Sequence, residues 1–170
     1  EVWLDFSANL RPEGTPYWVM QAMQDALFHT RYYPERTMKA ANHGLAAYVG
    51  VSPESILPTA GGAAAIDLAL SMSPGTVHVM PVTFSEYAER AKIHGRSISI
   101  WNGECAQGDT VVLCNPNNPT GEAMTRKQIL SLFEYVQSCG AEMIVDEAFI
   151  DFCPEYSVRQ DVQLGLTVVG

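Results

Sequence analysis

The segment VVLCNPNNPTGEAM, residues 111–124, decides which fold the chain is expected to adopt. Its first four residues are apolar without polar alternation, a pattern that is typical of a strand buried on both faces of a sheet. Pro116 and Pro119 then stiffen a loop that also carries three asparagines, and Gly121 permits an unusual backbone angle. A plain connection needs only one or two such residues, so this loop is a candidate for holding a ligand.

Helical and strand patterns alternate on both sides of this segment. Strands are expected at residues 55–58, 76–80, 97–101, 110–114, 142–145 and 164–170, and helices at 15–29, 37–50, 62–72, 85–95 and 125–139. Thr15 is the expected N-cap of the first helix, with Pro16 at its first helical position. The alternation predicts an α/β fold with a doubly wound, mainly parallel sheet and helices on both faces. In such a fold the ligand lies beyond the carboxyl ends of the strands.

Composition narrows the classes of partner. The 170 residues are 47% hydrophobic and 17% charged, as in one soluble domain. The net charge of −9 argues against binding to nucleic acid. No apolar run is long enough to span a bilayer, and the first residues do not show the basic and then apolar pattern of an export signal. The four cysteines and four histidines lack the spacing of a metal site, so no metal is expected. Scattered, reduced thiols indicate the cytoplasm.

The first strand end that carries chemistry precedes the helix expected at 62–72. Gly61 and Gly62 allow a sharp turn, and the small side chain of Ala63 lets a ligand approach the start of the helix. The unpaired N–H groups and the positive dipole end of a helix N-terminus suit a phosphate. The segment matches neither the P-loop nor the dinucleotide-binding pattern. The alternative is a tight turn followed by an alanine-rich packing helix.

Two further strand ends carry polar side chains. Asn115, Asn117 and Asn118 are either turn residues that bond to their own backbone or amides that donate to a phenolate oxygen. Asp146 follows an apolar strand, where a buried carboxylate needs a positive partner such as a protonated ring nitrogen. The alternative is an exposed acidic turn, an interpretation that also fits Glu147.

A phosphate site, an amide donor and a carboxylate together fit pyridoxal phosphate, which has a phosphate, a phenolic oxygen and a ring nitrogen. Phe84 follows another strand and is a candidate for stacking on the pyridine ring, although packing in the core is the commoner role of a phenylalanine. The sequence therefore predicts a pyridoxal-phosphate site at the carboxyl edge of the sheet.

The chain resembles the fold-type I pyridoxal-phosphate enzymes, the superfamily of aspartate aminotransferase that holds the class I and II aminotransferases. The resemblance is carried by DFSANLRPEGTP, RYYPE, ILPTAGGAAAIDLAL, PVTFSEY, NPNNPTG and VDEAFIDF, which together extend over nearly the whole chain. Within the superfamily the chain is most similar to the branch of histidinol-phosphate aminotransferases and threonine-phosphate decarboxylases. DFSANLRPEGTP, and Phe149 at a position where aminotransferases usually carry tyrosine, favour the decarboxylases.

The resemblance implies roles for individual residues at the cofactor. Asn118 is implied to bond the phenolic oxygen, and Phe84 to stack on the ring. Asp146 is implied to pair with the ring nitrogen, as the catalytic carboxylate. The backbone at residues 61–63 is implied to hold the phosphate.

Other implied roles concern assembly and substrate. Tyr33 is implied to reach the cofactor of a neighbouring subunit, which makes the expected assembly a homodimer. Asn9 and Gly14 are implied to lie over the substrate. Residues 1–30 are expected to form an N-terminal segment and helix on the substrate side, and 31–170 a partial large cofactor-binding domain.

In the superfamily a Ser-x-x-Lys segment follows the strand expected at 164–170, and its lysine forms the Schiff base with the cofactor. The sequence ends at Gly170, before that segment and before the small C-terminal domain, so we expect a truncated form without turnover. For the complete enzyme the resemblance implies decarboxylation of L-threonine phosphate to aminopropanol phosphate, in cobalamin biosynthesis. The alternatives are a histidinol-phosphate-type aminotransferase and a non-catalytic binding domain on the same scaffold.

Overall fold

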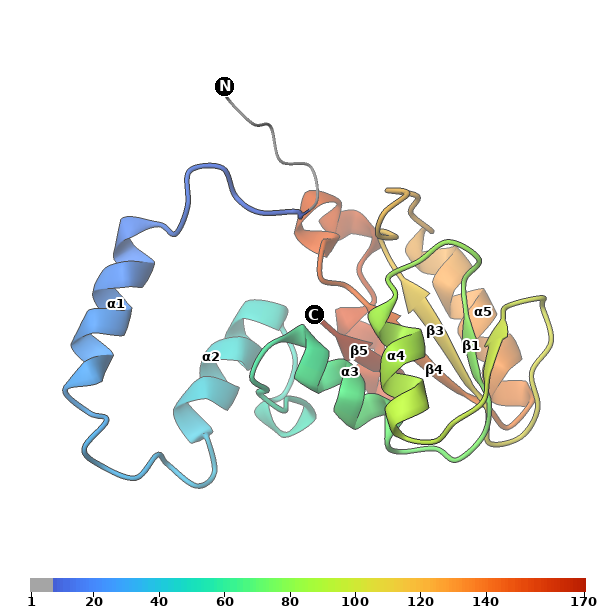
Figure 1. Cartoon of the computed structure of the whole chain (residues 1–170), viewed down its shortest axis with the longest axis horizontal. Coiled ribbons are helices and arrows are strands. Elements are labelled where there is room, and N and C mark those ends of the chain that lie inside the picture. The colour runs from blue at the N-terminus through green and yellow to red at the C-terminus, as the bar shows by residue number, and fades with distance from the viewer. Residues whose placement is uncertain (1–7) are drawn as a thin grey trace. The chain divides into compact units, whose positions relative to one another are not determined.

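The computed structural model describes residues 8–170; residues 1–7, which hold the start of the DFSANLRPEGTP motif, lie outside the described residues. The chain forms two compact units (Figure 1). Unit 1 ends at Lys39, and unit 2 covers Ala40–Gly170. Every strand of the sheet belongs to unit 2.

Helices and strands alternate along the described residues, as the sequence predicts from residue 62 onward. The helices are α1 (Tyr17–Leu27), α2 (Lys39–Val49), α3 (Gly62–Leu70), α4 (Glu86–Ile93) and α5 (Arg126–Ser138). The strands are β1 (Val77–Val79), β2 (Ile98–Ile100), β3 (Thr110–Cys114), β4 (Glu142–Asp146) and β5 (Thr167–Val169). Short 3-10 turns lie at Pro53–Ser55, Ile150–Phe152, Pro154–Tyr156 and Arg159–Leu164. Within residues 8–170, no helix has the length and apolar character that crossing a bilayer requires.

The five strands of unit 2 pair in parallel, in the order β2-β1-β3-β4-β5. The chain runs from β1 outward to β2 and then crosses back, which places β3 on the other side of β1. Strand order therefore reverses between β1 and β3, and open α/β sheets bind ligands in the crevice at such a reversal. The register pairs Cys114, at the end of β3, with Asp146, at the end of β4.

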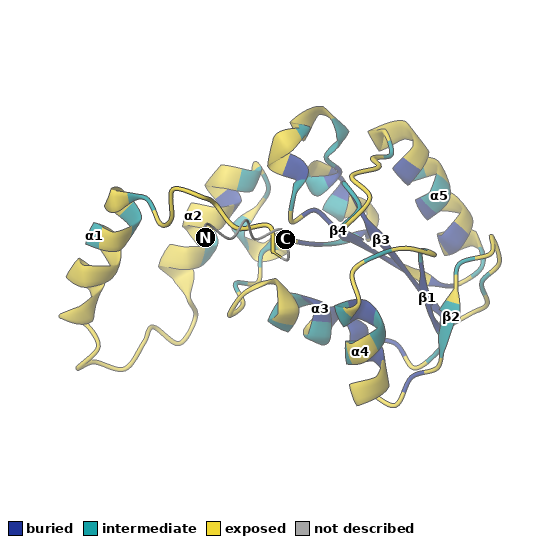
Figure 2. Cartoon of the chain, turned by 45° about the horizontal axis from the view of Figure 1, so that its top comes forward, coloured by how far each residue is buried: buried dark blue, intermediate teal, exposed yellow. Residues whose placement is uncertain are grey.

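Helices cover both faces of the sheet, which confirms the predicted doubly wound α/β fold. α3 and α4 pack on one face through buried residues that include Leu70 and Ala91. α5 packs on the other face through residues that include Ile129 and Val136. β3 lies between these layers and is buried along its whole length (Figure 2), which explains its unbroken apolar run.

Helix α1 lies wholly within unit 1, and none of its residues is buried (Figure 2). The helix begins at Tyr17, with Pro16 at the N-cap position. The expected N-cap at Thr15 is therefore wrong by one residue. The reason is that the backbone ψ of 142° at Pro16 is extended, so helical geometry starts only after the proline.

The strand expected at residues 55–58 is wrong. A 3-10 turn covers Pro53–Ser55, and the extended Ile56 that follows is not part of the described sheet. Pro53 and Pro58 flank this short segment and supply no N–H donor, so little remains that can pair with a neighbouring strand.

Candidate functional site

The ends of β3 and β4 and the helix after β1 meet at the carboxyl edge of the sheet. The N–H of Asn115 donates to the carbonyl oxygen of Asp146 over 2.8 Å, which extends the β3–β4 ladder by one residue. Tyr87, on α4, places its hydroxyl 2.8 Å from the Asp146 carboxylate and also contacts the Cys114 thiol. Three separate stretches of sequence therefore contribute to one site.

Asp146 is held in a buried and fixed position. Its side chain belongs to a residue that is only 5% exposed. One carboxylate oxygen, Oδ2, accepts the hydrogen bond from Tyr87, and the other, Oδ1, accepts one from the N–H of Ala148 over 2.9 Å. The alternative of an exposed acidic turn is therefore wrong for Asp146. Two donors, one on each oxygen, hold the carboxylate in a single orientation.

Two asparagines of the loop after β3 stabilise the loop itself. The amide of Asn115 donates to the carbonyl oxygen of Met124 over 3.1 Å and accepts from the N–H of Met124 over 2.7 Å. The amide of Asn117 donates to the carbonyl oxygen of Val82 over 2.7 Å and accepts from the Thr83 hydroxyl over 2.8 Å. These two side chains thus have structural roles, but the interpretation as residues that bond only their own turn is wrong: Asn115 fixes the loop to its far end at Met124, and Asn117 fixes it to the loop after β1.

Asn118 differs from its two neighbours. Its side chain is half-buried, and among residues 8–170 no group forms a hydrogen bond with its amide. Its backbone contacts the Cys114 thiol, which keeps the residue beside the end of β3. The amide is therefore free to donate to a ligand in the crevice, as its predicted role requires.

The start of α3 presents free backbone donors. Gly61 is the N-cap, and its φ of 87° and ψ of 168° lie in a region that is essentially restricted to glycine. The Thr59 hydroxyl donates to the Gly61 carbonyl oxygen over 3.0 Å and holds this turn. The N–H groups of Gly62 and Ala63, in the first turn of the helix, have no acceptor within it. A Cβ at Gly62 would meet no atom within 4 Å, so an anion has room to approach.

We expect Gly61→Ala to lower the free energy of unfolding of the chain by about 1–3 kcal/mol, because alanine is strained at this backbone angle. Gly62→Ala is the matched control: its φ is ordinary and its Cβ meets open space. We expect that control to be neutral or to stabilise the helix by up to about 1 kcal/mol. Urea unfolding of both variants measures the difference. Equal stabilities would contradict the conformation assigned to Gly61.

A cavity of about 320 Å³ adjoins the start of α3 and is lined in part by Gly61, Gly62 and Gly170. The backbone of Gly170 packs closely on Ala148: a Cβ on Gly170 would come within 2.7 Å of the Ala148 nitrogen. The cavity therefore extends from the start of α3 to Gly170, which packs on the segment that follows Asp146. These contacts place the free donors of α3 at the same end of the sheet as the carboxylate.

Phe84 lies in the loop after β1 and contacts Tyr87. The two ring centroids are 5.7 Å apart, with an angle of 83° between the ring planes. This edge-to-face contact fixes the Phe84 ring against α4. The residue remains 37% exposed, so part of the ring is accessible to a planar ligand.

Three predicted site residues, Asn9, Gly14 and Tyr33, belong to unit 1. Gly14 has a φ of 72° and closes a turn in which its N–H donates to the carbonyl oxygen of Arg11. Asn9 and Tyr33 are exposed. Their roles at the site of unit 2 stay predictions.

Glu147 is the residue that the sequence analysis misplaced. Its side chain is 0% exposed and forms an ion pair with Arg159 over 3.1 Å. It also accepts hydrogen bonds from the Ser157 hydroxyl over 2.8 Å and from the N–H of Val158 over 2.6 Å. Burial raises the pKa of Glu147, although these donors and Arg159 lower it. The exposed-turn interpretation is therefore wrong, because the partners that allow burial lie ten and more residues along the chain.

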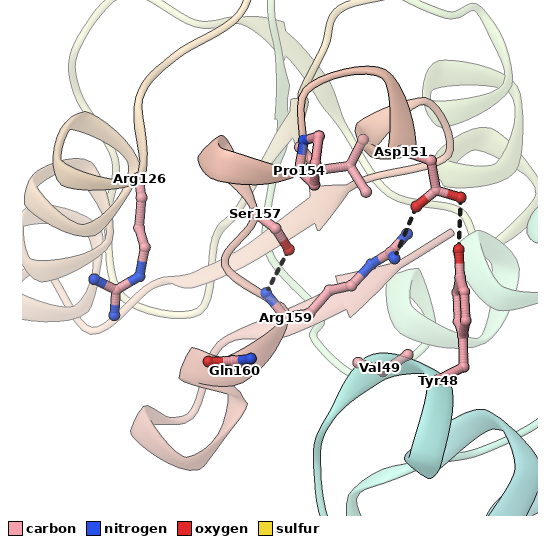
Figure 3. Close-up of a pocket in the computed structure, with 9 residues that line it drawn as sticks. Tyr48, Val49, Arg126, Asp151, Pro154, Ser157, Arg159 and Gln160 are labelled. Atoms are coloured by element: carbon pink, nitrogen blue, oxygen red, sulfur yellow. Dashed lines mark hydrogen bonds and ion pairs between the residues drawn. The ribbon is translucent and has the colours of Figure 1, made fainter.

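Arg159 also lines a second cavity, of about 350 Å³, that the sequence analysis did not predict (Figure 3). There it is paired with Asp151 over 3.3 Å, and its guanidinium lies 5.9 Å from the centre of the Tyr48 ring. The Tyr48 hydroxyl donates to the second oxygen of Asp151 over 2.6 Å. Arg126, at the opposite side of the cavity, is paired with the buried Asp161. Arg159 and Arg126 each already form an ion pair with an aspartate of the protein, so we assign this cavity no ligand.

Comparison with known proteins gives consistent matches. The family model described as aminotransferase class I and II matches residues 1–169. The chain is 32% identical to the histidinol-phosphate aminotransferase of Aeromonas salmonicida, over 92% of this chain and 46% of the relative. It is 31% identical to the threonine-phosphate decarboxylase of Salmonella typhimurium, over 89% of this chain and 46% of the relative.

Among solved structures, the histidinol-phosphate aminotransferase of Sinorhizobium meliloti in complex with pyridoxal-5'-phosphate is similar, with a TM-score of 0.74. The sequence identity is 18%, and the match covers 88% of this chain and 45% of that one. At this identity the match shows a shared fold. The chain spans about half the length of the curated relatives it matches.

Proposed function

Because the chain belongs to the aminotransferase class I and II family, we propose that it forms the cofactor-binding part of a pyridoxal-phosphate enzyme. The observation that carries the proposal is the buried, doubly hydrogen-bonded Asp146 carboxylate at the end of β4, the strand next to the reversal between β1 and β3. The relatives are about twice as long, so the activity proposed below is that of a whole protein of their length.

The polar groups at the carboxyl edge of the sheet fit the three polar groups of pyridoxal phosphate. Asp146 offers a buried carboxylate for the ring nitrogen, and Asn118 offers an amide without a recorded partner for the phenolic oxygen. The first turn of α3 offers free N–H groups and the positive end of the helix dipole for the phosphate. Phe84 offers a partly exposed ring for stacking.

When bound, pyridoxal phosphate supplies a ring that accepts the electron pair released from a bond at the substrate Cα. Asp146 contributes charge, because an ionised carboxylate keeps a proton on the ring nitrogen. Asn118 contributes a neutral hydrogen bond, which orients the phenolic oxygen without adding charge. The burial of Asp146 strengthens its electrostatic effect, because little water lies beside it to screen the charge.

For the reaction, we propose decarboxylation of L-threonine phosphate to aminopropanol phosphate. DFSANLRPEGTP and Phe149 support it, since a phenylalanine ring provides no hydroxyl for the cofactor's phenolic oxygen. Transamination of histidinol phosphate is the second candidate. A histidinol-phosphate aminotransferase matches at 32% identity and a threonine-phosphate decarboxylase at 31%, so sequence identity does not favour either reaction. The two reactions share the cofactor and differ in which bond at Cα breaks.

Product analysis of the full-length protein distinguishes the two reactions. We expect carbon dioxide from L-threonine phosphate and no glutamate from histidinol phosphate with 2-oxoglutarate. Phe149→Tyr, which restores the hydroxyl of the aminotransferases, is the matched variant, and we expect it to retain decarboxylation. Glutamate formation without carbon dioxide would show that the aminotransferase is the correct assignment. Cofactor binding without either product would favour the non-catalytic domain.

We further propose a cytoplasmic homodimer in which Tyr33 reaches the cofactor of the partner subunit. Two observations support an assembly: Tyr33 is fully exposed, and α1 has no buried residue. Large apolar side chains of α1, such as Trp18 and Met23, are exposed as well. The net charge of −9 disfavours nucleic acid as a partner.

A further inference from the structure

Tyr87 is a buried polar residue at the candidate site, and the proposed function assigns it no role. It lies on α4, is 0% exposed, and donates its hydroxyl hydrogen to Asp146 Oδ2 over 2.8 Å. The same ring supports Phe84 edge to face. A buried tyrosine hydroxyl needs a hydrogen-bond partner, and here that partner is the carboxylate at the candidate site rather than a backbone carbonyl.

The surroundings fix which groups carry the protons. Burial and the neighbouring Asp146 charge raise the pKa of the Tyr87 phenol far above its ordinary value, so the hydroxyl remains a donor. Burial also raises the pKa of the Cys114 thiol, a second titratable group that faces Asp146, from the neighbouring strand. Both neighbours are therefore neutral at physiological pH, so neither adds a charge beside the Asp146 carboxylate.

We propose that Tyr87 is a positioning residue that acts through Asp146 to keep the ring nitrogen of bound pyridoxal phosphate protonated. The proposal rests on the proposed function. A hydrogen bond donated to a carboxylate stabilises its charged form and makes it a weaker base. The proton shared between Asp146 and the ring nitrogen therefore stays on the nitrogen, where it makes the ring an electron sink.

The hydrogen bond also fixes the direction of the carboxylate. Tyr87 holds Oδ2 from α4, and the Ala148 N–H holds Oδ1 from the segment after β4. With one donor on each oxygen, rotation of the carboxylate breaks at least one bond. Each oxygen keeps a free lone pair for the cofactor, since an ionised carboxylate has about four acceptor sites.

The test measures the protonation of the cofactor rather than turnover. Pyridoxal phosphate labelled with nitrogen-15 in the ring is bound to the chain, and NMR at one fixed, neutral pH measures whether the shared proton lies on the ring nitrogen or on Asp146. We expect Tyr87→Phe to shift this equilibrium about tenfold toward the unprotonated ring, because Asp146 is the stronger base without its donor; tenfold is the equivalent of about one pKa unit. Tyr48→Phe is the matched control, because it also removes a tyrosine–aspartate hydrogen bond, to Asp151. We expect its ring-nitrogen resonance to equal that of the unmodified chain.

A graded substitution tests the donor itself. Incorporation of 3-fluorotyrosine at position 87 keeps the ring and strengthens the hydroxyl as a donor, so the ring-nitrogen resonance is expected to move toward the protonated form instead of away from it. This variant also provides the test if Tyr87→Phe does not fold. Bound cofactor with an unchanged resonance in both variants would overturn the role of Tyr87 and leave the proposed function intact. No binding of pyridoxal phosphate to the unmodified chain would overturn the proposed function and this inference with it.

Discussion

Asp146→Asn is expected to lower the turnover of the full-length protein at least about a hundredfold, which corresponds to about 2.7 kcal/mol of transition-state stabilisation. Asparagine keeps the shape of the side chain and can still accept one hydrogen bond. It removes the charge that, in the proposed function, holds the proton on the ring nitrogen, and a neutral ring is a weaker electron sink. Steady-state measurement of kcat with saturating cofactor tests this expectation.

The matched control for this experiment is Asp67→Asn. Asp67 lies on α3 and pairs with His94 over 3.1 Å, so the substitution also removes one aspartate charge but leaves the carboxyl edge intact. We expect its turnover to remain within about twofold of the unmodified enzyme, less than about 0.4 kcal/mol. Near-normal turnover in Asp146→Asn would remove Asp146 from its catalytic role.

Arg159→Ala is expected to lower the free energy of unfolding by about 3–5 kcal/mol at neutral pH, because it leaves the Glu147 carboxylate buried without its cation. The side chain of Arg159 is 18% exposed and that of Glu147 is 0% exposed, so water cannot replace the lost partner easily. Urea unfolding of the chain measures the loss.

The pH dependence of the stability loss in Arg159→Ala is a second test of the Glu147–Arg159 pair. The folded-state pKa of Glu147 is raised above its ordinary value by burial, so its contribution to stability is greatest at low pH and is lost as the pH rises through the folded pKa. Arg159 opposes that rise, so its removal raises the pKa of Glu147 further. We therefore expect the deficit of Arg159→Ala to shrink as the pH falls toward the ordinary glutamate value of 4.5.

Arg90→Ala is the control for Arg159→Ala. Arg90 pairs with Glu86 one helical turn away, and both side chains are about one-third exposed. Such pairs contribute about 0.3–0.5 kcal/mol, so the control separates the effect of a buried partner from that of losing any arginine. Equal losses in the two variants would contradict the assignment of Glu147 and Arg159 as a buried pair.

The fold was predictable because its signals are local. The unbroken apolar run of β3 predicts a strand buried on both faces, and the alternation of elements after residue 62 predicts the parallel, doubly wound sheet. The failure at residues 55–58 is also local in origin: apolar residues indicate a strand, but two flanking prolines remove donors that a strand needs.

The site was predictable only in part, because side-chain partners are set by distant segments. Asn115, Asn117 and Asn118 look alike in the sequence, yet the side chains of two of them bond to the protein, and no hydrogen bond joins the amide of the third to residues 8–170. Glu147 looks like half of an exposed acidic turn until the fold brings Arg159 against it. No periodic pattern encodes such pairs, so they become visible only in three dimensions.

The cross-linking of the loop after β3 has a thermodynamic consequence for the cofactor. Asn115 binds the end of its own loop at Met124, and Asn117 binds the loop after β1 at Val82. The conformational entropy of these segments is thus lost during folding rather than during binding, as in any preorganised receptor. A substitution that loosens either amide would weaken cofactor affinity without touching the cofactor.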